Sequence, residues 1–204
     1  MAKPVHLQPR RSLSPTQELI WTSQRLAPES PHQNMALVTR FGGPLDPTRF
    51  LKAVDAVVAD SDALRTTIRS VDGVAHPTVL AAPPSPCRIA RVDRSELDAW
   101  MHDRIATPID VSVAAYESVL VDLGRNGKVD GDESGEQQWA WFVNIHHLAI
   151  DAAGWANFFN AVASKYHGEK PELPRYSETW PELLESAAEK RVIRARDHLS
   201  LIHI

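Results

Sequence analysis

One segment, Trp139 to His147, limits the possible folds more than any other part of the chain. In an extended strand its side chains alternate between two faces, and both faces are largely apolar. Such a strand is typical of the centre of a sheet whose two faces are both covered. A helical pattern with an apolar stripe follows at once, from about Asp151 to Gly168. The sequence therefore predicts a buried central strand that leads directly into a helix.

The rest of the chain alternates between helical and extended patterns. Ser14, with Pro15 after it and Gln17 three residues on, forms a capping box that predicts a helix to about Leu26. Asp46 is the expected N-cap of a second helix. Further expected elements are a third helix from Ser95, a hairpin turn at Asp72-Gly73, and strands at 35–41, 64–70, 75–80, 89–92 and 116–123. We expect an α+β fold, a two-layer sandwich of helices on a mixed β-sheet.

Composition and charge exclude several classes of protein. A net charge of -4 argues against general binding to nucleic acid or to anionic membranes, because both need a basic surface. The single cysteine, Cys87, excludes a disulfide framework and a metal site with several thiolate ligands. No apolar run approaches ~20 residues, and the start of the chain has no signal-peptide pattern. We therefore expect a cytoplasmic protein without a membrane span.

Two adjacent histidines, His146 and His147, stand where the central strand meets the next helix. Sheets present side chains to a cleft at such junctions. A neutral imidazole there could take a proton from an amine or a hydroxyl, because its ordinary pKa lies near neutrality. Consecutive strand residues point in opposite directions, so the two rings cannot share that role or converge on a metal ion. Local hydrogen bonding at a sheet edge is the alternative explanation for such a pair.

The wider pattern favours the catalytic interpretation. The sequence His-His-x-x-x-Asp from His146 to Asp151, with Gly154-Trp155 behind it, resembles the active-site motif of condensation domains of nonribosomal peptide synthetases. More broadly, it resembles the chloramphenicol-acetyltransferase-like superfamily of acyltransferases. Three other segments are similar to the first and second condensation motifs and to a degraded fourth one, in the family's order: Leu13–Trp21, Asp62–Thr66 and Tyr176–Trp180.

The extent of the resemblance implies the N-terminal lobe of the chloramphenicol-acetyltransferase-like fold. It covers the chain from Leu13 to about Trp180, which is only the first half of the family's domain. The apolar end of the chain looks cut, and its connector would lead toward an absent second lobe. The expected organisation is a flexible N-terminus at 1–12, a condensation-type lobe at 13–168 with a mobile loop at 124–136, and a proline-rich connector and helix at 169–204.

The resemblance also implies roles for individual residues. His147 would be the catalytic residue, and His146 would pack beneath the loop that carries it. Asp151 would be structural, because in the family it pairs with the arginine that matches Arg65 and so holds this loop. Removal of one partner from a buried ion pair typically costs ~3–5 kcal/mol, which makes such a pair a strong brace.

One position departs from the family's pattern. Ala152 follows the aspartate where the family usually has glycine. An alanine forced into a left-handed conformation there would cost ~1–2 kcal/mol, so either the backbone relaxes at this position or the reaction channel is altered. Gly154, two residues later, is expected to support the loop.

The implied function is condensation-type acyl transfer, with amide or ester formation, in nonribosomal peptide and secondary metabolite biosynthesis. The donor would be a carrier-protein or coenzyme A thioester, so the phosphopantetheine arm belongs to the partner. We expect no cofactor or metal bound by the chain itself, and we expect an acyl or peptidyl carrier protein and a missing C-terminal lobe as partners. Two alternatives stay open: a non-catalytic remnant or carrier-protein interaction module, and a standalone acyltransferase that makes a lipid or polyketide ester.

Overall fold

The computed structural model describes residues 13–125 and 135–171, all within the first of two compact units, Met1–Pro171. The expectations for 1–12, for most of the loop at 124–136, for the connector and helix beyond 171 and for the motif at Tyr176–Trp180 lie outside the described residues. In chain order the elements are α1 (Pro15–Leu26), β1 (Asn34–Arg40), α2 (Pro47–Asp60), β2 (Thr66–Val71), β3 (Val74–Val79), β4 (Arg88–Arg91), α3 (Leu97–Ala106), β5 (Tyr116–Arg125), β6 (Gln137–His146) and α4 (Ala152–His167).

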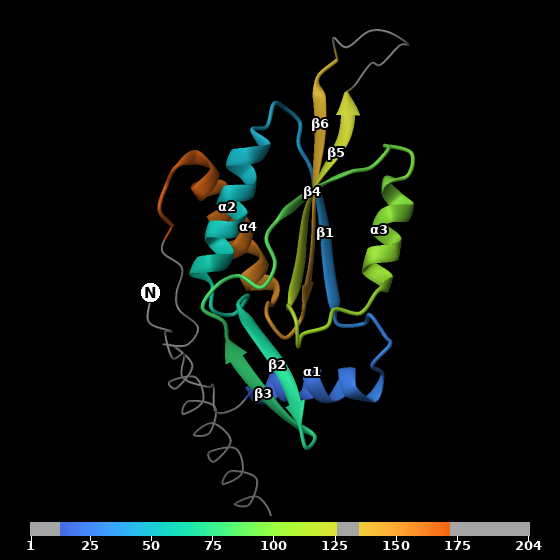
Figure 1. The fold of residues 1–204 in the computed structure, drawn as a ribbon, viewed down its shortest axis with the longest axis vertical. Helices are drawn as coiled ribbons and strands as arrows, with labels where there is room; N and C mark the ends of the chain where they lie inside the picture. Colours follow the sequence, from blue (N-terminus) through green and yellow to red (C-terminus); the bar gives the residue numbers. More distant parts are fainter. Residues whose placement is uncertain (1–12, 126–134, 172–204) are drawn as a thin grey trace, which may run out of the picture. The chain divides into compact units, whose positions relative to one another are not determined.

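The main sheet has four strands in the order β1-β6-β5-β4 (Figure 1). β6 pairs antiparallel with β1 and with β5, whereas β4 runs parallel to β5. β2 and β3 form a separate two-stranded sheet. This arrangement confirms the predicted mixed sheet and places β6 in its interior.

Helices cover both faces of the main sheet, α2 and α4 on one face and α3 on the other (Figure 1). On one face of β6, the ring of Trp141 contacts Phe50 of α2 and Phe159 of α4. On the other face, the ring of Phe142 lies 5.3 Å from that of Trp100 in α3. β6 is buried along almost its whole length. The α+β class and the central strand are therefore confirmed, and α3 adds a third layer to the expected two.

Local signals predicted two helix starts and one hairpin correctly. Ser14 Oγ accepts a hydrogen bond from the Gln17 amide at 3.0 Å, and Gln17 Oε1 accepts one from the Ser14 amide at 3.1 Å. The side chain of Asp46 caps α2 by accepting a hydrogen bond from an amide of its first turn. Asp72 and Gly73 both have positive φ, 51° and 79°, as the tight turn between β2 and β3 requires.

The predicted start of the third helix at Ser95 is wrong. α3 begins at Leu97, and Glu96 before it makes no capping bond with its side chain. The Glu96 amide bonds instead to the Asp93 carbonyl at 2.9 Å. Because that bond closes a turn, the chain at Ser95 is not yet helical.

A small apolar cluster joins α1 and the β2–β3 hairpin to the turn that follows β6. Its buried members are Leu13, Ile68, Val111 and Leu148, and Trp21 of α1 packs against them. Leu148 belongs to the turn itself and is only 4% exposed. Burial of this side chain therefore anchors the turn, since removal of apolar surface from water is favourable.

Leu148→Ala tests this anchor. Truncation of a buried leucine leaves a cavity, so we expect the free energy of unfolding to fall by about 2–5 kcal/mol. Leu19→Ala is the matched control, because Leu19 is 74% exposed on α1 and its loss should cost less than about 0.5 kcal/mol. Urea denaturation followed by tryptophan fluorescence measures both variants. Equal losses in the two variants would contradict the anchoring role.

Candidate active site

His147 is the first residue after β6 and its side chain is exposed. Its amide donates to the Gln33 carbonyl at 2.9 Å, just before β1. Its ring nitrogen Nδ1 lies 3.0 Å from the Ile150 carbonyl oxygen. Because a carbonyl oxygen only accepts, this contact requires a proton on Nδ1, so in the neutral ring the lone pair is on Nε2. The geometry therefore offers an exposed nitrogen that can accept a proton.

His146 points the opposite way and is completely buried. Its Nδ1 accepts a hydrogen bond from the Leu148 amide at 3.1 Å, so the ring proton sits on Nε2. Among the described residues, Nε2 has no hydrogen-bond partner. Burial above all, with the neighbouring charges of His147 and His32, lowers the pKa of His146 to about 4. The ring is therefore neutral at pH 7 and serves as an internal support of the turn.

Gln17 reaches the same turn from α1. Its Nε2 donates to the Leu148 carbonyl at 2.8 Å, across 131 positions of sequence. The sequence predicted Gln17 only as part of a capping box, because nothing local signals so distant a contact. Gln33 and Ile150, whose carbonyls hold the amide and the ring of His147, were likewise not predicted.

Asp151 ends the turn and begins α4. Its Oδ1 accepts a hydrogen bond from the Gly154 amide at 2.8 Å, so the exposed carboxylate caps the helix N-terminus. A Cβ atom at Gly154 would lie 2.7 Å from Cγ1 of Ile150. The glycine therefore makes room for the residue whose carbonyl holds His147.

The expected ion pair between Arg65 and Asp151 is not formed within the part of the chain that the structure describes. The Arg65 guanidinium donates through Nη1 to the Leu80 carbonyl at the end of β3. The Leu80 amide in turn bonds to the Arg65 carbonyl at 2.9 Å. The two charges are thus engaged separately, the guanidinium by a backbone carbonyl and the carboxylate by the N-terminus of α4.

At Ala152 the backbone has relaxed, which is one of the two outcomes that the sequence left open. Over residues 13–125 and 135–171, Asp72 is the only non-glycine residue with positive φ. Ala152 is the first residue of α4 and has an ordinary helical backbone. Alanine is well suited to that position, so its presence carries no conformational cost.

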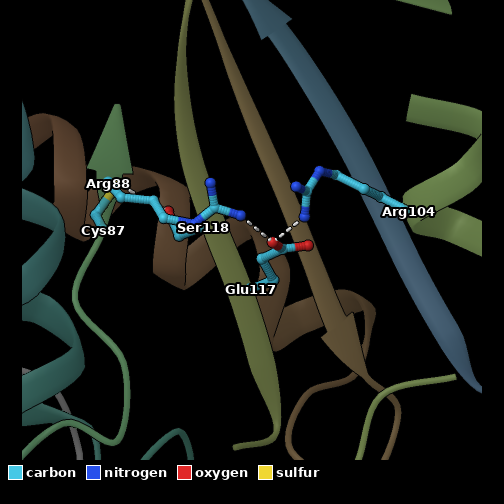
Figure 2. Close-up of polar contacts among 5 residues, drawn as sticks. All are labelled: Cys87, Arg88, Arg104, Glu117 and Ser118. Atoms are coloured by element: carbon cyan, nitrogen blue, oxygen red, sulfur yellow. Dashed lines mark hydrogen bonds and ion pairs between the residues drawn. The ribbon is translucent and has the colours of Figure 1, made fainter. Parts of the chain in front are cut away.

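Polar contacts on the two faces of β5 connect it to its neighbours (Figure 2). Glu117 lies between Arg88 of β4 and Arg104 of α3, with 2.8 Å between its Oε1 and Nη2 of Arg88. Ser118 faces the other way, and its hydroxyl donates to Sγ of Cys87 at 3.2 Å. Burial raises the pKa of Cys87 to about 11, so the thiol stays protonated at neutral pH. These residues have structural roles, and Cys87 is not a candidate nucleophile.

Metal-ligand clusters and membrane-spanning helices are both absent from the described residues. Across the described ranges, histidine, cysteine and carboxylate side chains form no group of three or more that could hold a metal ion. None of the described helices combines the length and the apolar character needed to cross a membrane. The exposed ring of His147, held by the Ile150 carbonyl, makes the turn after β6 the candidate site.

The chain is similar to known proteins in sequence and in fold. A family model described as the condensation domain matches residues 8–196. An isonitrile lipopeptide synthase of Streptomyces coeruleorubidus is 30% identical over 165 residues, which cover 77% of this chain and 10% of that protein. A dimodular nonribosomal peptide synthase of Bacillus subtilis (strain 168) is 26% identical over 162 residues, which cover 76% of this chain and 6% of that protein.

Solved structures share the fold. The starter condensation domain of rhizomide synthetase RzmA matches with a TM-score of 0.71 and 24% identity, over 93% of this chain and 48% of that one. The first condensation domain of the CDA synthetase matches with a TM-score of 0.63 and 20% identity, over 79% and 42%. Another RzmA structure, with a TM-score of 0.72, is a complex with C8-CoA and Leu-SNAC. The chain thus spans less than half of these solved domains and about a tenth or less of the two curated relatives.

The buried His146 ring should make the stability of the chain depend on pH. Its pKa is about 4 in the folded chain against 6.5 for an ordinary histidine, so the unfolded chain takes up the proton first. The contribution of His146 to the free energy of unfolding is therefore fully present above about pH 6.5. It is lost as the pH falls from about 6.5 to 4 and does not change further below pH 4. The total loss is roughly 3 kcal/mol.

His146→Asn is the control for this pH dependence. The asparagine Oδ1 lies near the position of Nδ1 and can still accept from the Leu148 amide, but it does not titrate. We expect urea unfolding at pH 7.5, 5.5 and 4.5 to show a steeper loss of stability in the wild type than in the variant. Equal slopes would show that this histidine is not a buried neutral group.

Gly154→Ala should destabilise the chain, although alanine favours a helix more than glycine does. The new Cβ meets Cγ1 of Ile150, and overpacking of this kind costs about 1–3 kcal/mol. In an Ile150→Ala background the clash disappears, so the same substitution should there be neutral or stabilising. Thermal unfolding of the wild type, of the two single variants Gly154→Ala and Ile150→Ala, and of the double variant measures both effects. If Gly154→Ala stabilises both backgrounds, the close approach does not matter.

Proposed function

This chain belongs to the condensation-domain family, and from that premise we propose that it is the histidine-bearing lobe of an acyltransferase that uses an acyl thioester. The observation that carries the proposal is the state of His147. Its side chain is exposed at the end of a buried strand, its Nδ1 is held by the Ile150 carbonyl, and its Nε2 is left as the acceptor. This is the arrangement that a general base requires.

The proposed reaction joins an acyl group to an amine. The amine nitrogen attacks the thioester carbonyl, a C–N bond forms and the C–S bond breaks. His147 Nε2 takes the proton that the amine loses and passes it to the departing thiolate, which leaves as a thiol. General-base assistance of this kind typically contributes ~10²–10⁴-fold to the rate.

The proposed substrates are thioesters on phosphopantetheine arms. An acyl or peptidyl carrier protein, or coenzyme A on the donor side, would supply the arm, so the chain would bind no cofactor of its own. The names of the relatives, which include nonribosomal peptide synthases, and the RzmA complex with C8-CoA and Leu-SNAC support this choice. A second lobe would complete the site, since the chain covers only 48% of the RzmA domain.

A non-catalytic interaction module is the second candidate. Within the described residues, Arg65 and Asp151 do not form the ion pair that would brace the motif. A chain that had lost catalysis would have no need of that brace. In this case the lobe would still bind its partners, but it would not accelerate amide formation.

The test is a reconstituted condensation reaction. The chain is combined with a second condensation lobe, C8-CoA as donor and an aminoacyl thioester as acceptor, and the product is measured by mass spectrometry. We expect amide formation with the wild type and a loss of at least about 100-fold with His147→Ala, because the general base is removed. When a hydroxyacyl thioester replaces the aminoacyl thioester as acceptor, the same assay measures ester formation.

Two results would overturn the proposal. Product formation by His147→Ala at the wild-type rate would remove the catalytic assignment. If the wild type forms no amide or ester but binds the second lobe, the interaction module is favoured instead. Asn34 is a suitable site for a control variant near the turn, since its side chain bonds the Ile105 and Thr107 carbonyls and the Ile109 amide and, among the described residues, makes no hydrogen bond to His147.

A further inference from the structure

The two peptide groups that follow His147 are both held by side chains. The first contains the Leu148 amide, which donates to Nδ1 of His146 at 3.1 Å. The second contains the Leu148 carbonyl, which accepts from Nε2 of Gln17 at 2.8 Å. Together with the bond from the His147 amide to the Gln33 carbonyl, these contacts hold the backbone on both sides of His147.

Of the two side-chain contacts, the one from Gln17 comes from a different part of the fold, whereas the one from His146 is local. α1 lies at the end of the main sheet where β6 ends (Figure 1). The same carboxamide uses its oxygen to accept from the Ser14 amide at 3.1 Å, within the capping box of α1. One side chain therefore joins a helix start to the turn, with the acceptor half facing the helix and the donor half facing the turn.

We propose that Gln17 is a positioning residue for His147. By holding the Leu148 carbonyl, it sets the path of the turn that brings the Ile150 carbonyl to Nδ1 of His147. The Ile150 contact in turn keeps the proton on Nδ1 and the lone pair on Nε2. The catalytic consequence rests on the proposed function, whereas the effect on the state of the ring does not.

A role limited to the helix cap is the competing explanation, and Gln17→Glu separates the two. Glutamate is as good a capping-box residue as glutamine, because its oxygen also accepts from the Ser14 amide. A carboxylate has no hydrogen to donate, so it cannot bond the Leu148 carbonyl. The variant therefore keeps the cap of α1 and loses the link to the turn.

The chain offers a matched control on the same helix. Gln24 is another α1 glutamine whose Nε2 donates to backbone carbonyls, those of Ala27, Pro28 and Ser30. Gln24→Glu makes the same chemical change and adds the same charge, but it affects only the loop that follows α1. Any effect of the added net charge should therefore appear in both variants, although the helix dipole favours a carboxylate at Gln17 and opposes one at Gln24.

The experiment has a spectroscopic arm and a kinetic arm. Nitrogen-15 NMR of the chain measures the tautomer of His147, and hydrogen exchange measures protection of the turn amides. For Gln17→Glu we expect a smaller Nδ1-protonated fraction and exchange at the Leu148–Ile150 amides that is roughly threefold to tenfold faster, as loss of one hydrogen bond predicts. Gln24→Glu should resemble the wild type. In the reconstituted reaction, kcat of Gln17→Glu should fall by a similar factor with KM unchanged.

The spectroscopic and the kinetic measurements can contradict the role of Gln17 and the proposed function independently of each other. If the wild type carries out no condensation, the proposed function fails while the NMR arm still tests the role of Gln17. If Gln17→Glu leaves both the tautomer of His147 and the turn exchange at wild-type values, Gln17 is only a capping residue and the proposal is overturned.

Discussion

The burial of β6 on both faces is the constraint on which the candidate site depends. Its backbone is paired on both sides, and its side chains pack against α2 and α4 on one face and α3 on the other. The strand therefore cannot shift, and the alternation of its side chains continues to its end. His146, the last residue, must point into the core, and His147, the next one, leaves the sheet. Two identical side chains thus acquire different environments from their position alone.

That difference in environment is what separates the two histidines chemically. Burial keeps His146 neutral, and a neutral ring can accept a hydrogen bond from the Leu148 amide without an uncompensated charge in the core. His147 is in contact with solvent, but the Gln33 carbonyl holds its amide and the Ile150 carbonyl holds its ring. The exposed ring is therefore held without being buried, which leaves its free nitrogen accessible to a substrate.

The features that the sequence predicted correctly are local ones. The capping box of α1, the Asp72-Gly73 turn and the two apolar faces of β6 all depend on residues within a few positions of one another. The features that it did not predict depend on distant contacts. Gln17 bonds Leu148 across the fold, and no local pattern distinguishes a glutamine that does so from one that only caps a helix. The sequence left the backbone of Ala152 open, because a residue type alone does not fix φ, and the structure shows an ordinary helical conformation there.

The separate engagement of Arg65 and Asp151 changes the physical account of the motif. An ion pair between them would hold the turn from outside, at the cost of desolvating both charges. Here the carboxylate caps α4, which fixes the far end of the turn, and Gln17 holds its middle. The Gln33 carbonyl holds its beginning through the His147 amide. Neutral hydrogen bonds and one helix cap thus restrain the turn along its length, so the orientation of the imidazole does not require the charge pair.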